Sequence, residues 1–138
     1  GDAYGQVTGI FLEQCHKGKP IMIHGDGSQT RSFTWVEEAV EGIRLAGELE
    51  QGLDGSNLAG AAFNLGNTEE VSIADLAKLC LEITGSKSEI QYQEVGHPGD
   101  ARRRKPDISE SESVLGWTPN QNLEQGLRSC WRWLQAEE

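Results

Sequence analysis

The sequence has 138 residues, enough for one domain with a modest hydrophobic core, and its 36% hydrophobic and 25% charged residues are typical of a globular protein. A net charge of −10 argues against general nucleic-acid binding, because phosphate backbones repel a strongly acidic protein. No apolar run approaches the roughly 20 residues that a membrane helix needs, and the acidic, mixed N-terminus is not the pattern of a signal peptide.

The first part of the chain predicts a helix, a strand, a turn and a second helix. Before Gly18 and Pro20, which end the first helix, apolar residues recur at helical spacing: Val7, Ile10, Phe11 and Cys15. Residues 20–24 predict a short strand, and the residues at 25–28 predict a glycine-rich turn. The second helix carries its apolar residues on one face: Val36, Ala39, Val40 and Ile43.

The middle of the chain predicts a loop, a strand and a third helix. Residues 47–60 form a glycine-rich loop, and residues 61–65 predict a buried strand. Ser72 and Asp75 have the spacing of a capping box at the start of the helix, and Gly85 stands at the usual position of a C-cap.

The last part predicts a strand over 89–95 and two further helices. Ser109 with Glu112 caps a short helix that ends before Gly116, and Asn122 opens the final helix. Strands alternate with helices, which favours an α/β arrangement. Only about three short strands are expected, fewer than sheets usually have, so some surface of this chain is expected to face a partner.

The cysteines indicate buried free thiols in a reducing cytoplasm. Cys15, Cys80 and Cys130 are odd in number, far apart and outside any CxxC motif, and the last two fall on apolar helix faces. His16 and His24 have no partner at metal-ligand spacing, so no metal site is expected.

Two polar segments carry the residue types that bind phosphate. In the segment 24–33, tight glycines let the backbone approach a ligand, and the planar guanidinium of Arg31 suits a diphosphate. In the segment 97–107, Asp100 can accept from ribose hydroxyls and the following arginines can meet phosphate. Taken alone, each segment is better explained by a plain surface turn with an arginine or by a polar loop before a helix.

Taken together, the segments resemble a known family. The strings GDGSQTRSFTWVEEAVEGI, FNLGNTEEVSIADLAKL and PGDARRRKPDISESESVLGWTP, followed by LEQGL, look like the consecutive signatures of the NAD-dependent epimerase/dehydratase family, extended short-chain dehydrogenases acting on nucleotide sugars. QTRSF and RKPDI make the UDP-glucuronate decarboxylases the closest resemblance. The match covers residues 1–138 and implies one nucleotide-sugar-binding region: the C-terminal substrate-binding part of that α/β fold, with few short strands, about five helices and no Rossmann half.

The resemblance also implies which residues touch the substrate. Arg31 would contact the diphosphate, while Asp100, Arg102 and, more weakly, Arg104 would close over the nucleotide. The strand and turn would line the nucleoside pocket, and the first helix would contact the sugar nucleotide, which gives four further residues: Ile23, His24, Val7 and Phe11. The family's pattern makes structural residues of three others: Asn64, Gly66 and Trp117.

Four positions depart from the family's pattern and put the identity of the substrate in doubt. Gln6 stands where many relatives have Arg, Ile10 where decarboxylases commonly have Asn, and His97 where several have Arg. His24 replaces a frequent aromatic residue. Each departure removes a polar, cationic or stacking contact.

The sequence contains neither of the family's two catalytic signatures. It has no GxGxxG fingerprint for the dinucleotide and no YxxxK pair, in which a tyrosine acts as the base. We therefore assign no catalytic and no cofactor-binding residue to this chain. The resemblance implies that NAD in the complete enzyme transiently oxidises the sugar at C4 before decarboxylation, elimination or epimerisation. Without the means to hold nicotinamide, the chain alone is expected to be inactive.

Other functions remain open at this point. The chain can be a non-catalytic nucleotide-sugar-binding or protein-interaction module that pairs with a separate dinucleotide-binding subunit, a Rossmann-type half, or with itself. A weaker alternative is polyanion binding through the basic run at 102–105.

Overall fold

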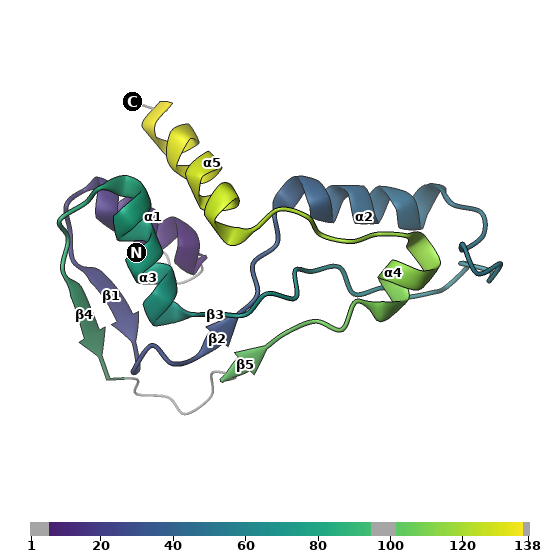
Figure 1. Cartoon of the computed structure of the whole chain (residues 1–138), viewed down its shortest axis with the longest axis horizontal. Coiled ribbons are helices and arrows are strands. Elements are labelled where there is room, and N and C mark those ends of the chain that lie inside the picture. Colours follow the sequence, from purple (N-terminus) through teal and green to yellow (C-terminus); the bar gives the residue numbers. More distant parts are fainter. Residues whose placement is uncertain (1–5, 95–101, 137–138) are drawn as a thin grey trace. The chain divides into compact units, whose positions relative to one another are not determined.

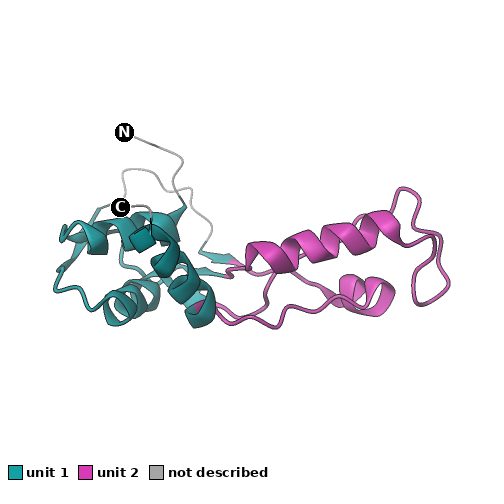
Figure 2. Ribbon diagram, turned by 90° about the horizontal axis from the view of Figure 1, so that it is seen from above, with its two compact units in different colours: residues 1–31, 71–103, 124–138 teal, residues 32–70, 104–123 magenta. Residues whose placement is uncertain are grey.

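The computed structural model describes residues 6–94 and 102–136, which form five helices and five short strands (Figure 1). Asp100 and His97 lie outside the described residues. The chain divides into two compact units, coloured separately in Figure 2. Unit 1 comprises Gly1–Arg31, Val71–Arg103 and Glu124–Glu138, and unit 2 comprises Ser32–Glu70 and Arg104–Leu123. The α/β fold class with few short strands is confirmed.

Unit 1 is built on a pair of parallel strands. β1 (Ile21–His24) pairs with β4 (Ile90–Gln93) in a register that runs from Ile21 opposite Ile90 to His24 opposite Gln93. Parallel strands need a crossover connection, and α3 (Ile73–Thr84) provides the helix that leads into β4. α1 (Val7–His16) contacts both α3 and β1.

The remaining elements are a second sheet of two-residue strands, whose β5 ends at the first residue of a unit 2 segment, and the last helix. A second sheet has the strand order β3-β2-β5, with two residues in each strand: Val71–Ser72, Thr30–Arg31 and Arg103–Arg104. The last helix is α5 (Leu123–Ala136). The core of unit 1 is apolar. Its buried residues come from β1 and from the helices α1, α3 and α5: Phe11, Leu12, Cys15, Ile21, Ile23, Ile73, Leu76, Ala77, Cys80 and Leu127.

Local signals set the ends of α3 as the sequence predicts. The Ser72 hydroxyl oxygen accepts a hydrogen bond from the Asp75 backbone N–H at 3.0 Å, which satisfies one of the donors that a helix start leaves open. Gly85 ends the helix in the left-handed conformation, with φ of 66°. The predicted capping residue and C-cap are both confirmed.

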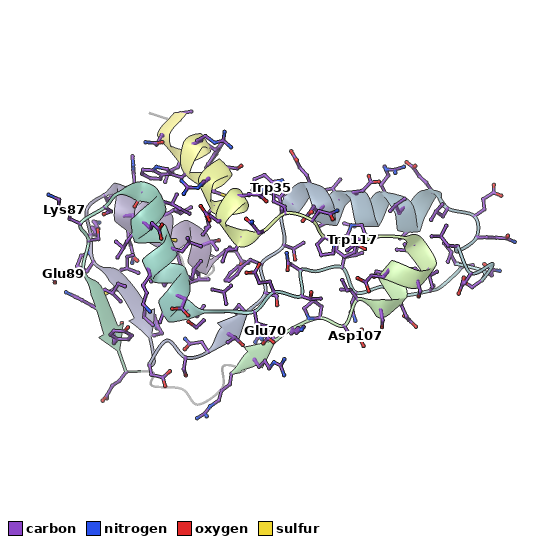
Figure 3. All side chains as sticks on the ribbon, viewed as in Figure 1. Trp35, Glu70, Lys87, Glu89, Asp107 and Trp117 are labelled. Atoms are coloured by element: carbon purple, nitrogen blue, oxygen red, sulfur yellow. The ribbon has the colours of Figure 1, made fainter. Side chains whose placement is uncertain are left out.

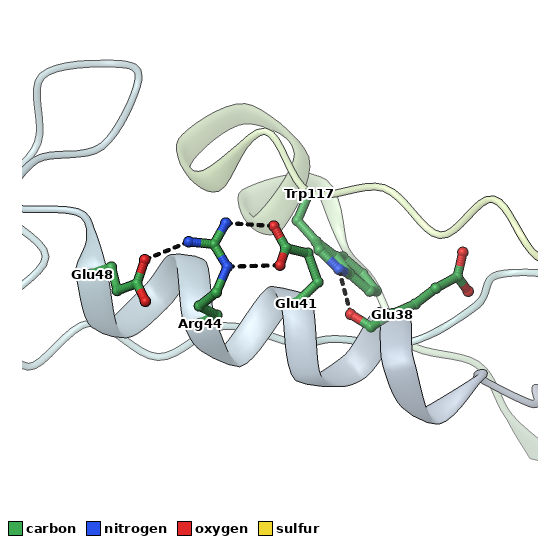
Figure 4. Close-up of polar contacts among 5 residues, drawn as sticks. All are labelled: Glu38, Glu41, Arg44, Glu48 and Trp117. Atoms are coloured by element: carbon green, nitrogen blue, oxygen red, sulfur yellow. Dashed lines mark hydrogen bonds and ion pairs between the residues drawn. The ribbon is translucent and has the colours of Figure 1, made fainter.

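Unit 2 is held together around a buried tryptophan. Trp117 lies between α2 (Val36–Glu48) and α4 (Ser109–Leu115) and donates its indole N–H to the Glu38 carbonyl oxygen at 2.8 Å (Figures 3 and 4). It shares the core with two buried residues, Ile108 and Leu115, and with half-buried apolar neighbours: Leu45, Ala46, Leu49, Leu58, Phe63, Leu65 and Val114. The packing role predicted for Trp117 is confirmed.

The structural roles expected of Asn64 and Gly66 are visible in unit 2. The Asn64 side-chain NH2 donates to the Asp107 carbonyl oxygen at 3.0 Å, and the Asn64 backbone carbonyl oxygen accepts from the Ser111 hydroxyl. A side chain at Gly66 would meet Pro106 Cγ at 2.8 Å, so only glycine fits this close approach.

Three local predictions are wrong. Residues 61–65 are not a strand, and Ala61 and Ala62 are exposed, because no neighbouring strand in the described residues pairs with them. The N-cap of α4 is Ile108, not Ser109. The Asp107 carboxylate instead accepts from the backbone N–H of Ser109 at 3.0 Å and from its hydroxyl at 2.7 Å. The strands also number five among the described residues, where about three were expected.

The outer face of α2 differs from a typical amphipathic helix. Val36, Val40 and Ile43 do share one face, but they are 62%, 58% and 65% exposed. Beside them, Arg44 forms ion pairs with Glu41 at 2.6 Å and with Glu48 (Figure 4). The side of α2 that packs on Trp117 carries Gly42, which is buried, with Leu45 and Ala46 half-buried beside it. Among the described residues, no helix is long and apolar enough to cross a membrane.

Candidate functional site

A pocket of about 260 Å³ opens within unit 1 between α1, β1 and the segment that follows β1. Its walls combine apolar and polar side chains from these elements and from the start of α3: Val7, Ile10, Phe11, Gln14, Met22, His24, Gln29, Arg31 and Ile73. Apolar walls with a few polar groups are typical of sites for organic ligands.

The periodicities of helix and strand place these side chains. Val7, Ile10, Phe11 and Gln14 stand at i, i+3, i+4 and i+7 of α1 and so share one helix face. Along β1, successive side chains alternate, so Ile21 and Ile23 are fully buried while Met22 and His24 line the pocket.

The structure brings four of the predicted substrate-binding residues to this pocket: Val7, Phe11, His24 and Arg31. Ile23 does not line it, because its side chain is 0% exposed and belongs to the core. Arg102 is exposed, and Arg104 is exposed in β5. Asp100 is outside the described residues.

The turn after β1 needs its glycines for close packing. Gly25 donates its N–H to the Gln93 carbonyl oxygen at 2.8 Å, and Gly27 has φ of 75°. A Cβ at Gly27 would lie 3.0 Å from Ala74 Cβ and 3.3 Å from Ile23 Cγ2. Asp26 closes the turn, because its carboxylate accepts from the Ser28 N–H at 2.9 Å and from the Ser28 hydroxyl at 2.7 Å.

The two phosphate-type segments of the sequence meet next to the turn. The backbone N–H of Thr30 donates to the Arg102 carbonyl oxygen at 2.9 Å. The pKa of the Asp26 carboxyl is lowered, chiefly by its hydrogen bonds from Ser28 and to a lesser extent by the positive charge of Arg102. The segment with Arg31 and the start of the basic run therefore lie side by side.

A backbone carbonyl restrains the guanidinium of Arg31. Its guanidinium donates to the Thr30 carbonyl oxygen at 2.7 Å, and the side chain is half-buried on the pocket wall. A guanidinium restrained in this way has less conformational freedom to lose when it binds an anion.

The start of α3 does not offer the site that a dinucleotide needs. A Rossmann-type unit binds pyrophosphate on open N–H groups at a helix N-terminus. Here the N–H of Ile73 donates to Gln29, that of Ala74 to Gly27, both at 3.0 Å, and that of Asp75 to Ser72. These three N–H groups are therefore not open to a pyrophosphate. Within the same part of the chain, no group of three or more His, Cys, Asp or Glu is placed to hold a metal ion.

Sequence reasoning did not select several residues of the pocket wall as binding residues: Ile10, Gln14, Met22, Gln29 and Ile73. Gln14 carries a usable signal, since it continues the helical spacing of Val7 and Phe11. The spacing of residues gives no such signal for Gln29, because its position in the pocket wall depends on how the turn after β1 folds back.

Comparison with protein families and curated sequences gives consistent matches. The family model described as GDP-mannose 4,6 dehydratase matches residues 6–130. UDP-glucuronic acid decarboxylase 2 of Arabidopsis thaliana is 36% identical over 123 residues, which are 89% of this chain and 26% of that protein. UDP-glucuronic acid decarboxylase 1 of Danio rerio is 35% identical over 133 residues, covering 96% of this chain and 30% of that protein.

Solved structures match nearly the whole chain. The UDP-glucose 4-epimerase of Thermotoga maritima, solved with UDP-glucose, is 31% identical, with a TM-score of 0.83 over 99% of this chain and 42% of its own. The UDP-glucuronic acid 4-epimerase of Bacillus cereus, solved with UDP-glucuronic acid and NAD, is 26% identical, with a TM-score of 0.85 over 96% and 40%. The chain thus spans less than half the length of each of these proteins.

Proposed function

The chain belongs to the GDP-mannose 4,6-dehydratase family of NAD-dependent epimerases and dehydratases, and on this premise we propose that it is the nucleotide-sugar-binding part of such an enzyme. Its ligand in this proposal is a UDP-sugar, and the reaction of the complete enzyme is the decarboxylation, dehydration or epimerisation of that sugar. The complete enzyme would hold NAD with residues other than those described here.

The pocket of unit 1 is the observation that carries the proposal. It gathers residues from α1, β1 and β2 that the family resemblance assigns to the substrate, although they are up to 24 positions apart, as Val7 and Arg31 are. Phe11 and Ile73 offer apolar surface for a base and ribose, while Arg31 offers the charge that a diphosphate requires.

The second basic segment supports the same ligand. The Thr30–Arg102 hydrogen bond keeps Arg102 next to β2, whose last residue is Arg31. A guanidinium on the pocket wall, with a second arginine on the neighbouring strand segment, favours a ligand with negative phosphates over a neutral sugar. The chain has a net charge of −10, so most of it repels anions. An anionic ligand is therefore attracted only where positive side chains gather.

Calorimetric titration of the chain with UDP-glucuronic acid, UDP and free glucuronic acid tests the proposal. Both nucleotides should bind and the free sugar acid should not. Arg31→Ala should weaken UDP binding by about tenfold or more, because a charge-assisted hydrogen bond is lost, and Arg31→Lys should restore only part of it. Arg128→Ala is the matched control, since Arg128 pairs with Glu124 on α5 and does not line the pocket. Absence of heat with either nucleotide would contradict the proposal.

A second role, pairing with a dinucleotide-binding half, rests on a different observation. Val36, Val40 and Ile43 form a continuous exposed apolar stripe on α2, and the neighbouring segment 61–65 lacks a strand partner among the described residues. Such surfaces are usually covered in a functional protein. We propose that a Rossmann-type half covers them in the complete enzyme, with self-association as the competing arrangement.

Sedimentation separates these arrangements. A dinucleotide-binding half taken from a relative and added to the chain should sediment with it, and the double change Val40→Asp/Ile43→Asp should abolish the complex. Glu37→Gln, also on the first part of α2, serves as the control. A chain that forms a stable dimer through the same stripe would favour self-association instead.

A further inference from the structure

We propose that the outer edge of β4 is an interface between two copies of this chain, which join their β4 strands antiparallel into one continuous sheet. Among the described residues, the sheet that contains β4 has only the two strands β1 and β4. A sheet this small is at the lower limit of what is stable, and further strands would stabilise it. The inference concerns unit 1 and does not depend on the proposed function or on the exposed stripe of α2.

One side of β4 is occupied by β1. Ile21 and Gly25 donate their backbone N–H groups to the carbonyl oxygens of Glu89 and Gln93, each at 2.8 Å. The parallel register between the two strands continues between these bonds without interruption. The backbone groups of Glu89 and Gln93 therefore face β1.

The other side of β4 is open. Backbone groups alternate in direction along a strand, so those of Gln91 also face β1, whereas the N–H and C=O groups of Ile90 and Tyr92 face away from it. In the part of the chain that the structure describes, no strand lies along this outer edge (Figure 1). Ile90 and Tyr92 thus present two donors and two acceptors that another strand can use.

The side chains of β4 do not protect this edge. Natural edge strands usually carry lysine, proline or a bulge, whereas the residues of β4 are Ile-Gln-Tyr-Gln, without a charge or a proline. Tyr92 is 57% exposed, although its cross-strand neighbour Ile23 on the same face is fully buried. A further strand beside β4 would cover the Tyr92 ring and extend the core side of the sheet.

The open edge is complementary to itself. In a two-fold antiparallel pair, Ile90 stands opposite the partner's Tyr92, and Tyr92 opposite the partner's Ile90. Each of these pairs exchanges two backbone hydrogen bonds and also sets an aromatic side chain against a β-branched one, which is a favourable cross-strand combination. Gln91 then lies on the two-fold axis, opposite the partner's Gln91. Because the same patch serves on both copies, the assembly closes at two.

The flanking charges favour this register. Glu89, which stands where β4 begins in Figure 3, faces the amide of the partner's Gln93, and Ser88 faces the partner's Glu94, so no two carboxylates are opposite each other. A shift by two residues would place the carboxylate of the partner's Glu94 beside Ile90, where it loses hydration. A shift by one residue would turn the side chains of one strand to the wrong face.

Disulfide trapping tests the register. Gln91 and the partner's Gln91 form a non-hydrogen-bonded pair with Cα atoms about 4.5 Å apart, which a disulfide can span. The variant Gln91→Cys, in a Cys130→Ser background that removes the half-buried thiol, should give a covalent dimer with oxidised glutathione. Two cysteine thiols are oxidised to one disulfide while one oxidised glutathione is reduced to two thiols.

Gln93→Cys in the same background is the matched control. Gln93 is exposed on the same strand, but it faces the partner's Glu89. It is therefore separated from the partner's Gln93 by four residues, or about 13 Å along the strand. This variant should remain largely monomeric under the same oxidation.

Analytical sedimentation of the whole chain tests the association itself. An interface of one short strand from each copy is small, so the average mass should rise towards twice that of the chain only between about 10 µM and 1 mM. Tyr92→Lys should keep the chain monomeric over this range, because it removes the ring and sets a positive charge on the edge. Gln135→Lys adds the same charge at an exposed position of α5 and should leave dimerisation unchanged.

The outcomes separate this interface from other kinds of association. A dimer that is lost in Tyr92→Lys, with trapping specific to Gln91→Cys, supports the inference. A chain that is monomeric up to about 1 mM overturns it, and so does trapping of Gln93→Cys as readily as Gln91→Cys. A dimer that survives Tyr92→Lys and is lost in Val40→Asp/Ile43→Asp assigns self-association to α2 instead. Circular dichroism confirms that each variant is folded.

Discussion

Ser72 is the last residue of β3 and the N-cap of α3, and its side-chain hydroxyl makes the capping hydrogen bond. Its oxygen accepts the Asp75 N–H at 3.0 Å, and its proton reaches the Asp75 carboxylate at 2.7 Å. The pKa of Asp75 is lowered, first by this hydrogen bond and then by the one from Lys78. Because the folded carboxyl has the lower pKa, its contribution is present at neutral pH and is lost as the pH falls through that pKa.

Ser72→Ala should lower the free energy of unfolding by about 1 kcal/mol, the usual cost of a lost N-cap. Denaturant unfolding monitored by circular dichroism at neutral pH measures the change. Ser72→Thr keeps the hydroxyl and should recover most of the loss. An alanine variant as stable as the unmodified chain would mean that α3 does not depend on this cap.

The thiols should differ in reactivity according to burial. Burial raises the pKa of all three thiols, that of Cys80 to about 12, so exposure decides which thiol a reagent reaches first. Cys130 is only half-buried and should react first with a thiol reagent, with Cys80 last. Peptide mapping by mass spectrometry after timed labelling gives the order. Labelling of Cys80 ahead of Cys130 in the folded chain would contradict the packing described here.

For single residues, the sequence predicted correctly those features that depend only on neighbouring residues in the chain, such as helix caps. The Ser72–Asp75 spacing and Gly85 identified both ends of α3 because capping is local. The N-cap of α4 was misassigned to Ser109, because Ile108 occupies that position without a capping side chain while Asp107 bonds the Ser109 N–H. Ile23 and His24 were assigned to one site, yet a strand sends adjacent side chains to opposite faces.

The helix α2 shows how one glycine sets the fit between elements. A Cβ at Gly42 would lie 2.6 Å from Leu65 Cδ2 and 3.0 Å from Trp117 Nε1. Gly47 lies five residues later in the same helix, and a Cβ there would meet nothing within 4 Å. The two glycines therefore provide a matched pair, one required by packing and the other not.

Gly42→Ala should destabilise the chain by about 1–3 kcal/mol, because an added methyl overpacks the core of unit 2. Gly47→Ala should stabilise it by about 0.5–1 kcal/mol, since alanine favours a helix over glycine. Urea unfolding of both variants measures the difference. Equal effects of the two substitutions would show that α2 does not pack on Trp117 as described.

Elements were predicted well where their pattern is local and less well where a partner decides. α1, β1 and α3 follow from spacing, glycines and caps, and each ends within a residue or two of its predicted position. Residues 61–65 have the apolar pattern of a buried strand, but a strand exists only when another strand pairs with it. The apolar face of α2 was found correctly, but its exposure could not be read from periodicity.

Across the whole molecule, the sequence connects elements that fold into two separate units. The core of unit 1 surrounds β1 and supports the pocket, while the core of unit 2 surrounds Trp117. The family resemblance assigned Arg31 and Arg102 to one ligand, and the Thr30–Arg102 hydrogen bond places the backbones of their two segments side by side. The place of Gln29 in the pocket wall was not predictable, because it depends on the path of the turn.

The chain by itself should not turn over substrate. Its sequence has neither GxGxxG nor YxxxK, and the first N–H groups of α3 are already bonded within the chain. Incubation with NAD and UDP-glucuronic acid should release no carbon dioxide and yield no new nucleotide sugar by chromatography. The same mixture with a dinucleotide-binding half of a relative is the informative comparison. Product from the chain alone would refute this prediction.

A crystal structure of the chain grown with UDP-glucuronic acid would test the account most directly. The account predicts the nucleotide in the pocket of unit 1, with its diphosphate on the guanidinium of Arg31. A nucleotide bound elsewhere, or a diphosphate that leaves Arg31 without contact, would contradict it.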